Sequence, residues 1–388
     1  MKIACVVHRY GAEIAGGSEA HCRHVAEHLA SRHDVTVLTS CAKDHVTWQN
    51  AYPPGDTTVN GVRVRRFPVA RQRSLHRFAA ISAATSDRRH TQDQEREWFR
   101  ENGPDLPDLL AHLAASGRDY DRVLFWAFRY AESFFGLPLV ADRAILVPTA
   151  EEDPVVKFDV LETYFRLPRG FIFLTPEEQA LVARRASTLA VPSCVIGSGL
   201  DPAAAPRPRP LDGPGVREPF MLYLGRVDPN KGCALLLRHF MRYAAERPDG
   251  SMQLVLAGPA NMPIPVHPAI RPLGFVSEET REALLARAAL LVVPSRYESL
   301  SLALLEGWNH GRPALVNGRC AVLEGQVRRA GGGLYFRDYD EFACATDYLL
   351  AHPDVARELG CQGLAYVDRE YRWGKVIDRI EKLLSDTG

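Results

Sequence analysis

The sequence predicts an α/β protein with two Rossmann-like domains that face a central cleft. Three observations support this fold class. The chain has 388 residues, more than a single hydrophobic core usually serves. Short β-branched runs alternate with helix-like segments, a pattern typical of parallel sheets. Residues 201–218 are rich in proline, which favours a linker between two domains.

Residues 1–200 are expected to form the first domain. Its predicted strands are Ile3–Val7, Val35–Thr39, Val62–Phe67, Arg122–Trp126, Ala144–Val147 and Phe171–Leu174. Its predicted helices are Glu19–Ser31, Gln92–Asn102, Leu106–Ala115 and Glu177–Arg185. The stretch from Gln72 to Arg89 mixes basic and small residues, and no element is predicted there.

Residues 219–370 are expected to form the second domain, in which a new series of strands and helices begins. The predicted strands are Phe220–Leu224, Gln253–Ala257, Leu290–Val293 and Ala314–Val316. The predicted helices are Leu235–Ala245, Glu279–Ala286, Leu300–His310, Asp340–Ala351 and Pro353–Tyr366, and a last amphipathic helix, Gly374–Leu384, is predicted beyond this domain. Since ligands bind such folds at the carboxyl ends of parallel strands, the chemistry is expected in the loops that follow the strands.

Composition excludes several classes of protein. The 47 basic and 47 acidic residues give a formal net charge of zero, which argues against a nucleic-acid footprint. No apolar run is long enough to span a membrane, and the run Met1–Val7 is too short for a signal peptide. The eight cysteines lack a C-x-x-C pair and the 13 histidines lack metal-ligand spacing. We therefore expect a cytoplasmic protein with reduced cysteines and no metal.

The first chemical motif follows a predicted strand. Arg226 and Lys231 lie in the loop from Gly225 to Gly232, between the strand that ends near Gly225 and the next helix. A guanidinium and an ammonium on one short loop can bind a diphosphate, and arginine can contact two oxygens at once. Taken alone, the loop is also compatible with a solvated basic turn.

The second motif is a pair of glutamates around a helix start. Glu298 lies in the loop after the buried run Leu290–Val293, and Glu306 lies within the following helix. The N–H groups of Ser299, Leu300, Ser301 and Leu302 lie between them, near a helix N-terminus that favours a phosphate. Carboxylates accept hydrogen bonds from hydroxyl groups, so this arrangement suits a sugar–diphosphate–ribose ligand.

Together these motifs resemble glycosyltransferase family 4, whose retaining members have the GT-B fold and use nucleotide-sugar donors. The E-x7-E motif of that family matches Glu298 through Glu306, and its G-R-x-x-x-x-K-G loop matches Gly225 through Gly232. The resemblance covers most of the chain and is strongest from Phe220 to Phe336. Where many members have Gly-Phe-Gly after the first glutamate, this chain has Ser-Leu-Ser.

The resemblance implies a role for each residue of the second domain. Arg226 and Lys231 would bind the diphosphate and stabilise the leaving group, and Glu298 would contact the transferred sugar. Glu306 would bind the ribose hydroxyls. The Ser299–Leu302 amides would reach phosphate and sugar, and the segment with Phe275 and Val276 would line the nucleobase.

In the first domain the resemblance rests on weaker motifs. Gly16 and Gly17 would form the loop that faces the donor phosphate and the acceptor, with Ser18 available to cap the next helix. Gly197-x-Gly199 resembles the exit from this domain. Residues 371–388 resemble the helix that crosses back to it.

The main departure from the family lies in the loop from Pro148 to Pro154. Many relatives carry a His-Asp pair there, and Glu151 stands where the histidine aligns. Asp153 before Pro154 is well suited to cap a helix, whereas Glu151 and Glu152 are not needed for capping. The sequence leaves open whether Glu151 replaces the histidine in catalysis or shapes the acceptor site.

The predicted function is transfer of a hexose-type sugar from a UDP-, GDP- or dTDP-sugar to an acceptor hydroxyl, with retention. The acceptor is expected to be a glycan, a glycolipid or a small molecule. A non-catalytic nucleotide-sugar-binding protein is an alternative because of Glu151. An NAD-dependent oxidoreductase is disfavoured, since His8 through Gly17 lacks G-x-G-x-x-G. Basic residues at 63–73 suggest either peripheral contact with the inner membrane face or a solvated surface.

Overall fold

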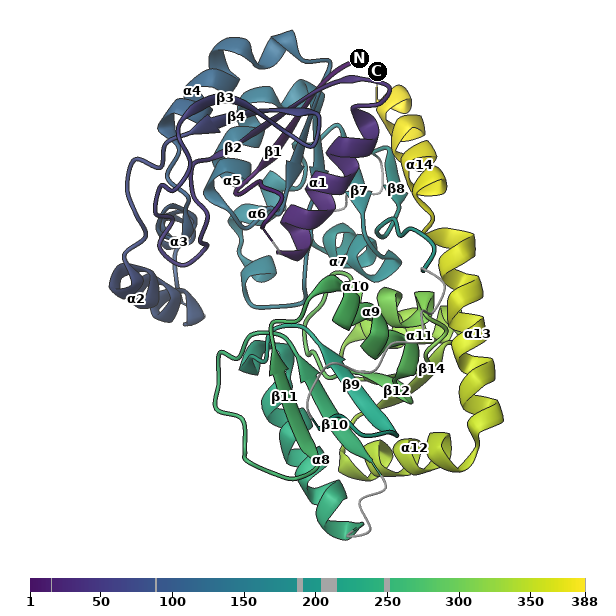
Figure 1. Cartoon of the computed structure of the whole chain (residues 1–388). Coiled ribbons are helices and arrows are strands. Elements are labelled where there is room, and N and C mark those ends of the chain that lie inside the picture. Colours follow the sequence, from purple (N-terminus) through teal and green to yellow (C-terminus); the bar gives the residue numbers. More distant parts are fainter. Residues whose placement is uncertain (15, 88, 187–190, 204–214, 248–251, 388) are drawn as a thin grey trace. The chain divides into compact units, whose positions relative to one another are not determined.

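The computed structural model describes residues 1–14, 16–87, 89–186, 191–203, 215–247 and 252–387, so most of the predicted linker lies outside the described residues. The chain divides into two compact units (Figure 1). Unit 1 comprises Met1–Ser198 and Gly374–Gly388, and unit 2 comprises Gly199–Trp373. The chain therefore leaves unit 1, completes unit 2 and returns to unit 1.

Unit 1 contains an eight-stranded sheet within the described residues, in the order β3-β4-β2-β1-β5-β6-β7-β8. The strands are β1 (Lys2–Val7), β2 (Asp34–Ser40), β3 (Gly55–Val59), β4 (Val62–Phe67), β5 (Arg122–Trp126), β6 (Ala144–Val147), β7 (Gly170–Phe173) and β8 (Ser193–Val195). All neighbours pair in parallel except β3 and β4. The buried central strands are the apolar runs expected from the sequence.

The helices of unit 1 follow the strands in the alternating order of a doubly wound fold. They are α1 (Gly17–Leu29), α2 (Leu75–Ser86), α3 (Gln92–Asn102), α4 (Pro107–Ser116), α5 (Ala131–Gly136), α6 (Val160–Tyr164), α7 (Pro176–Ala186) and α14 (Trp373–Asp386). Helix α2 occupies the stretch for which the sequence predicts no element. Within unit 1, Glu381 of α14 forms an ion pair with Arg32, which lies in the turn after α1, at 2.8 Å.

Unit 2 contains a six-stranded parallel sheet within its described residues, in the order β11-β10-β9-β12-β13-β14. The strands are β9 (Phe220–Leu224), β10 (Gln253–Ala257), β11 (Ile270–Gly274), β12 (Leu290–Val293), β13 (Ala314–Asn317) and β14 (Gly333–Phe336). The helices are α8 (Cys233–Glu246), α9 (Glu278–Arg287), α10 (Leu302–Asn309), α11 (Ala321–Ala330), α12 (Tyr339–Ala351) and α13 (Pro353–Glu370).

Strand β9 shows how the sheet of unit 2 is buried on both faces. Phe220 and Leu222 pack into one hydrophobic core, whereas Met221 and Tyr223 pack into another. Successive side chains of a strand point to opposite faces, so a strand between two cores must be apolar throughout. The uninterrupted run Phe-Met-Leu-Tyr-Leu meets this requirement, and the burial of both faces leaves the strand ends available to bind ligands.

Candidate active site

The two chemical motifs of unit 2 lie on neighbouring loops. Strands β9 and β12 pair in parallel through Met221 and Leu290, so their carboxyl ends lie at the same edge of the sheet. The loop with Arg226 and Lys231 follows β9, and the loop with Glu298 follows β12. The sheet topology thus brings together motifs that are about 70 residues apart in the chain.

The loop after β9 is shaped by two glycines and an aspartate. Gly225 has φ of 135° and Gly232 has φ of 75°, values that side chains rarely adopt. A Cβ on Gly232 would overlap the carbonyl oxygen of Pro294, which follows β12. Asp228 caps the short 3-10 helix Pro229–Lys231 by accepting from the Asn230 N–H at 2.9 Å. The glycines therefore allow the two loops to pack closely.

Lys231 and Glu298 form an ion pair across these loops. Lys231 Nζ lies 2.9 Å from Glu298 Oε1, and the Glu298 side chain is only 9% exposed. Arg226 is exposed on the same loop. Lys231, which is expected to bind the diphosphate, thus directly contacts Glu298, which is expected to bind the sugar. The sequence alone did not predict this contact.

Glu306 of α10 pairs with a residue that the sequence analysis missed. Arg281 of α9 donates from Nη1 to Glu306 Oε1 at 2.5 Å and also pairs with Glu278. Burial raises the pKa of Glu306, and the Arg281 charge opposes this rise. No local pattern around Arg281 distinguishes it from any basic residue on an exposed helix, so the contact could not be read from the sequence.

The start of α10 presents the backbone groups that the second motif predicted. Ser301 caps this helix by accepting a hydrogen bond from the Leu304 N–H at 3.3 Å. Ser299 and Ser301 are buried, whereas Leu300 and Leu302 are half-buried. Phe275 and Val276 lie in the loop after another strand of this unit, β11, and Phe275 is 82% exposed.

In unit 1, Gly16 and Gly17 lie at the start of α1, as predicted. Ser18 does not cap this helix, so that prediction is wrong: the N-cap is Gly16, and the Ser18 hydroxyl donates to Glu19 instead. Glu19 also binds Arg9 and lies 2.9 Å from His8 Nε2. A Cβ on Gly16 would overlap the Glu19 carboxylate. A side chain at position 16 would therefore force the Glu19 carboxylate to move away from its partners His8 and Arg9.

A buried polar cluster lies beneath this glycine loop, and the sequence analysis did not predict it. His8 stacks on Tyr130 with ring centroids 3.7 Å apart, and His8 Nδ1 lies 3.8 Å from Glu132 Oε1. Burial raises the pKa of Glu132 well above its usual value. Burial alone would also raise the pKa of Glu19, but His8 and Arg9 lower it below its usual range. The surroundings of the cluster thus shift the pKa values of its two carboxyl groups in opposite directions.

The loop with Glu151 follows β6 at the carboxyl edge of the unit 1 sheet. Glu151 is half-buried, and Glu152 is exposed. Asp153 pairs with Arg129, and its Oδ1 accepts from the Val155 N–H at 3.0 Å, at the start of the turn Val155–Lys157. Pro154, not Asp153, is the N-cap of this turn, so the predicted position of the cap is wrong by one residue, although the Asp153 carboxylate still accepts from the first N–H groups of the turn.

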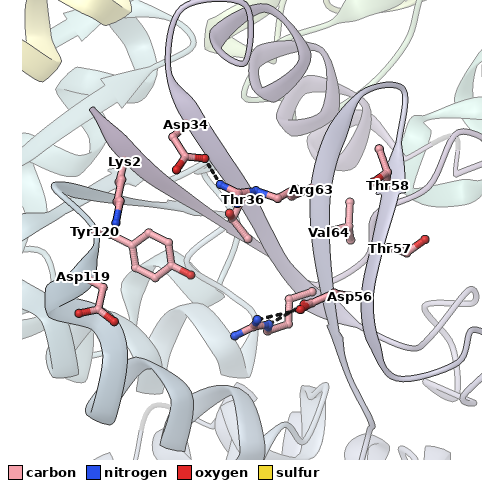
Figure 2. Close-up of a pocket in the computed structure, with 11 residues that line it drawn as sticks. Lys2, Asp34, Thr36, Asp56, Thr57, Thr58, Arg63, Val64, Asp119 and Tyr120 are labelled. Carbon is pink, nitrogen blue, oxygen red and sulfur yellow. Dashed lines mark hydrogen bonds and ion pairs between the residues drawn. The ribbon is translucent and has the colours of Figure 1, made fainter.

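A pocket of about 440 Å³ lies at the opposite edge of the unit 1 sheet (Figure 2). Lys2 and Asp34, at the amino ends of β1 and β2, line it. Its arginines are paired, Arg63 with Asp34 and Arg65 with Asp56. Ligands of doubly wound folds bind at the carboxyl edge of the sheet, so this pocket is not the candidate active site.

The two parallel sheets, with loops carrying Arg226, Lys231, Glu298 and Glu306 in unit 2, define a protein of the GT-B fold class. Residues 218–352 match the family described as "Glycosyl transferases group 1". This stretch contains all four residues.

Comparisons with individual proteins found a related glycosyltransferase and solved structures with a similar fold. An alpha-D-kanosaminyltransferase of Streptomyces kanamyceticus is 31% identical over 190 residues, which cover 44% of this chain and 46% of the relative. The chain thus spans about half the length of this curated relative. Sucrose-phosphate synthase of Thermosynechococcus elongatus superposes with a TM-score of 0.70 at 20% identity, covering 99% of this chain and 98% of that one. The structure of HepE of Anabaena in complex with UDP-glucose superposes with a TM-score of 0.70 at 15% identity, covering 100% of both chains.

One further property concerns membranes. Among the helices of the described residues, none is both long enough and apolar enough to cross a lipid bilayer.

Proposed function

We propose that this protein is a retaining glycosyltransferase of family 4, which transfers a hexose-type sugar from a nucleoside diphosphate sugar to an acceptor hydroxyl. The observation that carries the proposal is the Lys231–Glu298 pair, 2.9 Å apart, with Arg226 on the same loop. It lies within the stretch that matches the glycosyltransferase family.

The donor would bind to unit 2. Arg226 and Lys231 would bind the diphosphate, together with N–H groups at the start of α10. Lysine has three N–H donors, so Lys231 can hold a phosphate oxygen while it stays paired with Glu298. Glu306, oriented by Arg281, would accept hydrogen bonds from the ribose hydroxyls. Exposed Phe275, together with Val276, would contact the nucleobase.

The reaction would break the bond between the anomeric carbon and the diphosphate oxygen. Arg226 and Lys231 would stabilise the negative charge that develops on the departing diphosphate. The acceptor oxygen would attack from the same face, and its proton would pass to the leaving phosphate oxygen. Glu298 would bind the sugar hydroxyls. Two cations and a helix N-terminus can neutralise a diphosphate, so we propose that no metal is needed.

UDP-glucose is the first donor to test, since the HepE structure was solved with that molecule. The likeness to HepE is of fold alone, so GDP- and dTDP-sugars belong in the same experiment. The acceptor would be a glycan, a glycolipid or a small molecule, and Gly16, Gly17 and Glu151 of unit 1 would face it. A second candidate is a protein that binds nucleotide sugars without catalysis, because Glu151 stands where relatives carry histidine.

The experiment that tests the proposal combines binding with turnover. UDP-, GDP- and dTDP-glucose are compared for their effect on Tm, where a donor at 100 times its Kd stabilises by about 2.7 kcal/mol. Arg226→Ala should abolish the shift, and the exposed Arg238→Ala on α8 serves as its control. Release of nucleoside diphosphate separates the enzyme from the non-catalytic binder. The proposal fails if none of the three donors shifts Tm.

A further inference from the structure

Glu178 of α7 has an ordinary structural role at the start of its helix. Thr175 and Glu178 have the S/T-x-x-E spacing of a capping box, and the Glu178 N–H donates to Thr175 Oγ1 at 3.2 Å. A glutamate that serves only this purpose turns its carboxylate back toward the backbone of the N-cap residue. Any further contact of the Glu178 carboxylate therefore requires a separate explanation.

The carboxylate of Glu178 joins two loops at the carboxyl edge of the unit 1 sheet. Its Oε1 accepts from the Ala150 N–H at 2.6 Å, and its Oε2 accepts from the Leu174 N–H at 2.6 Å. Leu174 directly follows β7, and Ala150 lies in the loop after the neighbouring strand β6. Glu178 and Ala150 are each only 1% exposed. Glu178 thus fixes the backbone of the β6 loop from within the protein.

The β6 loop has a conformation that must be held in place. Thr149 has a φ of 48°, in the left-handed region that β-branched residues rarely enter. Such a backbone persists only where the surroundings determine it, and it occurs most often at functional sites. The peptide N–H that follows Thr149 is that of Ala150, which Glu178 binds. Pro148 on the other side accepts from the Phe128 N–H at 3.2 Å.

We propose that Glu178 is a positioning residue for sugar transfer, because it holds Thr149 in its left-handed conformation and thereby sets the backbone from which Glu151 projects. This inference rests on the proposed function, in which Glu151 belongs to the acceptor side of the site. Glu178 itself touches neither substrate, since it is buried. Burial raises the pKa of Glu178 to about 8.

The test uses the 388-residue chain and four variants of it. Glu178→Gln keeps the shape of the side chain but replaces one of its acceptors with a donor. Thr149→Gly removes the backbone strain, because glycine adopts positive φ freely. The double variant combines both changes. Glu162→Gln is the matched control, since it makes the same chemical change at a half-exposed helical glutamate.

Four quantities are measured: the rate of hydrogen exchange of the Ala150 amide, the Kd for UDP-glucose, and both kcat and KM for UDP release from UDP-glucose with water as acceptor. Glu178→Gln should speed exchange at Ala150 at least tenfold and lower kcat at least tenfold, with Kd changed less than twofold. The double variant should recover kcat at least threefold over Glu178→Gln. A glutamate that only caps α7 would show no such recovery.

The outcomes separate this proposal from the proposed function. If wild-type protein neither binds nor cleaves UDP-, GDP- or dTDP-glucose, the proposed function fails and this inference with it. If wild-type protein releases UDP but Glu178→Gln leaves kcat unchanged, only the positioning role is overturned. The same holds if the double variant is no more active than Glu178→Gln, or if Kd rises as much as kcat falls.

Discussion

Arg281 donates to Glu306 at 2.5 Å, so the carboxylate expected to bind ribose is held by a cation from the neighbouring helix α9. Burial raises the pKa of Glu306, and this cation opposes the rise. The ionised state of Glu306, which accepts hydrogen bonds from hydroxyl groups, therefore depends on a residue outside both motifs.

Arg281→Met is expected to weaken donor binding about tenfold, because the pKa of Glu306 rises further when the guanidinium is lost. An acid with a raised pKa is protonated at higher pH, so the loss of affinity should grow as pH falls from 8 to 5. Titration calorimetry with UDP-glucose across this range checks the prediction. The exposed Arg238→Met is the control. A loss of affinity that is independent of pH would contradict this explanation.

Lys231→Ala is expected to lower kcat for UDP release about 100-fold, the magnitude found when a donor to a developing negative charge is removed. Lys231→Arg should not restore the rate, because the planar guanidinium does not fit a site shaped for an ammonium paired with Glu298. Initial rates at saturating donor measure the effect, with the exposed Lys382→Ala as control. An arginine variant with full activity would refute the prediction.

Glu132→Gln is expected to change how stability depends on pH. The folded protein keeps the Glu132 proton to higher pH than the unfolded chain, because burial raises its pKa well above 4.5. Above pH 4.5 the unfolded chain binds fewer protons, so stability falls as pH rises, by up to about 1.4 kcal/mol per unit. The glutamine variant should lose this slope in urea unfolding at pH 5, 6, 7 and 8. If the free energy of unfolding of wild type and variant depends on pH in the same way, the prediction is wrong.

Gly16→Ala and Gly17→Ala form a matched pair. A Cβ at position 16 would overlap the Glu19 carboxylate, whereas nothing lies within 4 Å of a Cβ at position 17. Gly16→Ala should lower the free energy of unfolding by about 1–3 kcal/mol, the usual cost of overpacking. Gly17→Ala should change it by less than about 0.5 kcal/mol. Denaturant unfolding measures the free energy of unfolding of both variants. Equal losses of stability would contradict the predicted overlap at position 16.

Much of the fold is predictable from the sequence because its central strands are buried. Strands β4, β5 and β6 match the predicted ranges: β5 and β6 are mostly apolar, and β4 alternates buried valines with arginines. Strand β3 was missed, because its residues are mostly exposed and polar. Its turn was readable: Asn60 and Gly61, with φ of 48° and 82°, form the Asn-Gly turn typical of tight hairpins.

The candidate site was predictable only where its residues form a short motif in the sequence. Spacing placed Lys231 and Glu298 on loops after strands, but their direct contact depends on the sheet order. Arg281, Glu132 and Glu178 act through contacts with residues distant in the sequence. Ser18 shows the reverse error, since a residue suited to capping donates to Glu19 instead.

Unit 1 is assembled from two separate stretches of chain, and this bears on how the protein is made. A ribosome delivers residues 199–373 as one continuous block, so unit 2 can fold as soon as it has emerged. Unit 1 stays incomplete until residues 374–388 appear, because α14 belongs to this unit and buries apolar side chains such as Val376 and Ile380. The domain synthesised first is thus the last to be finished, and truncation near the C-terminus would damage the fold of the N-terminal half.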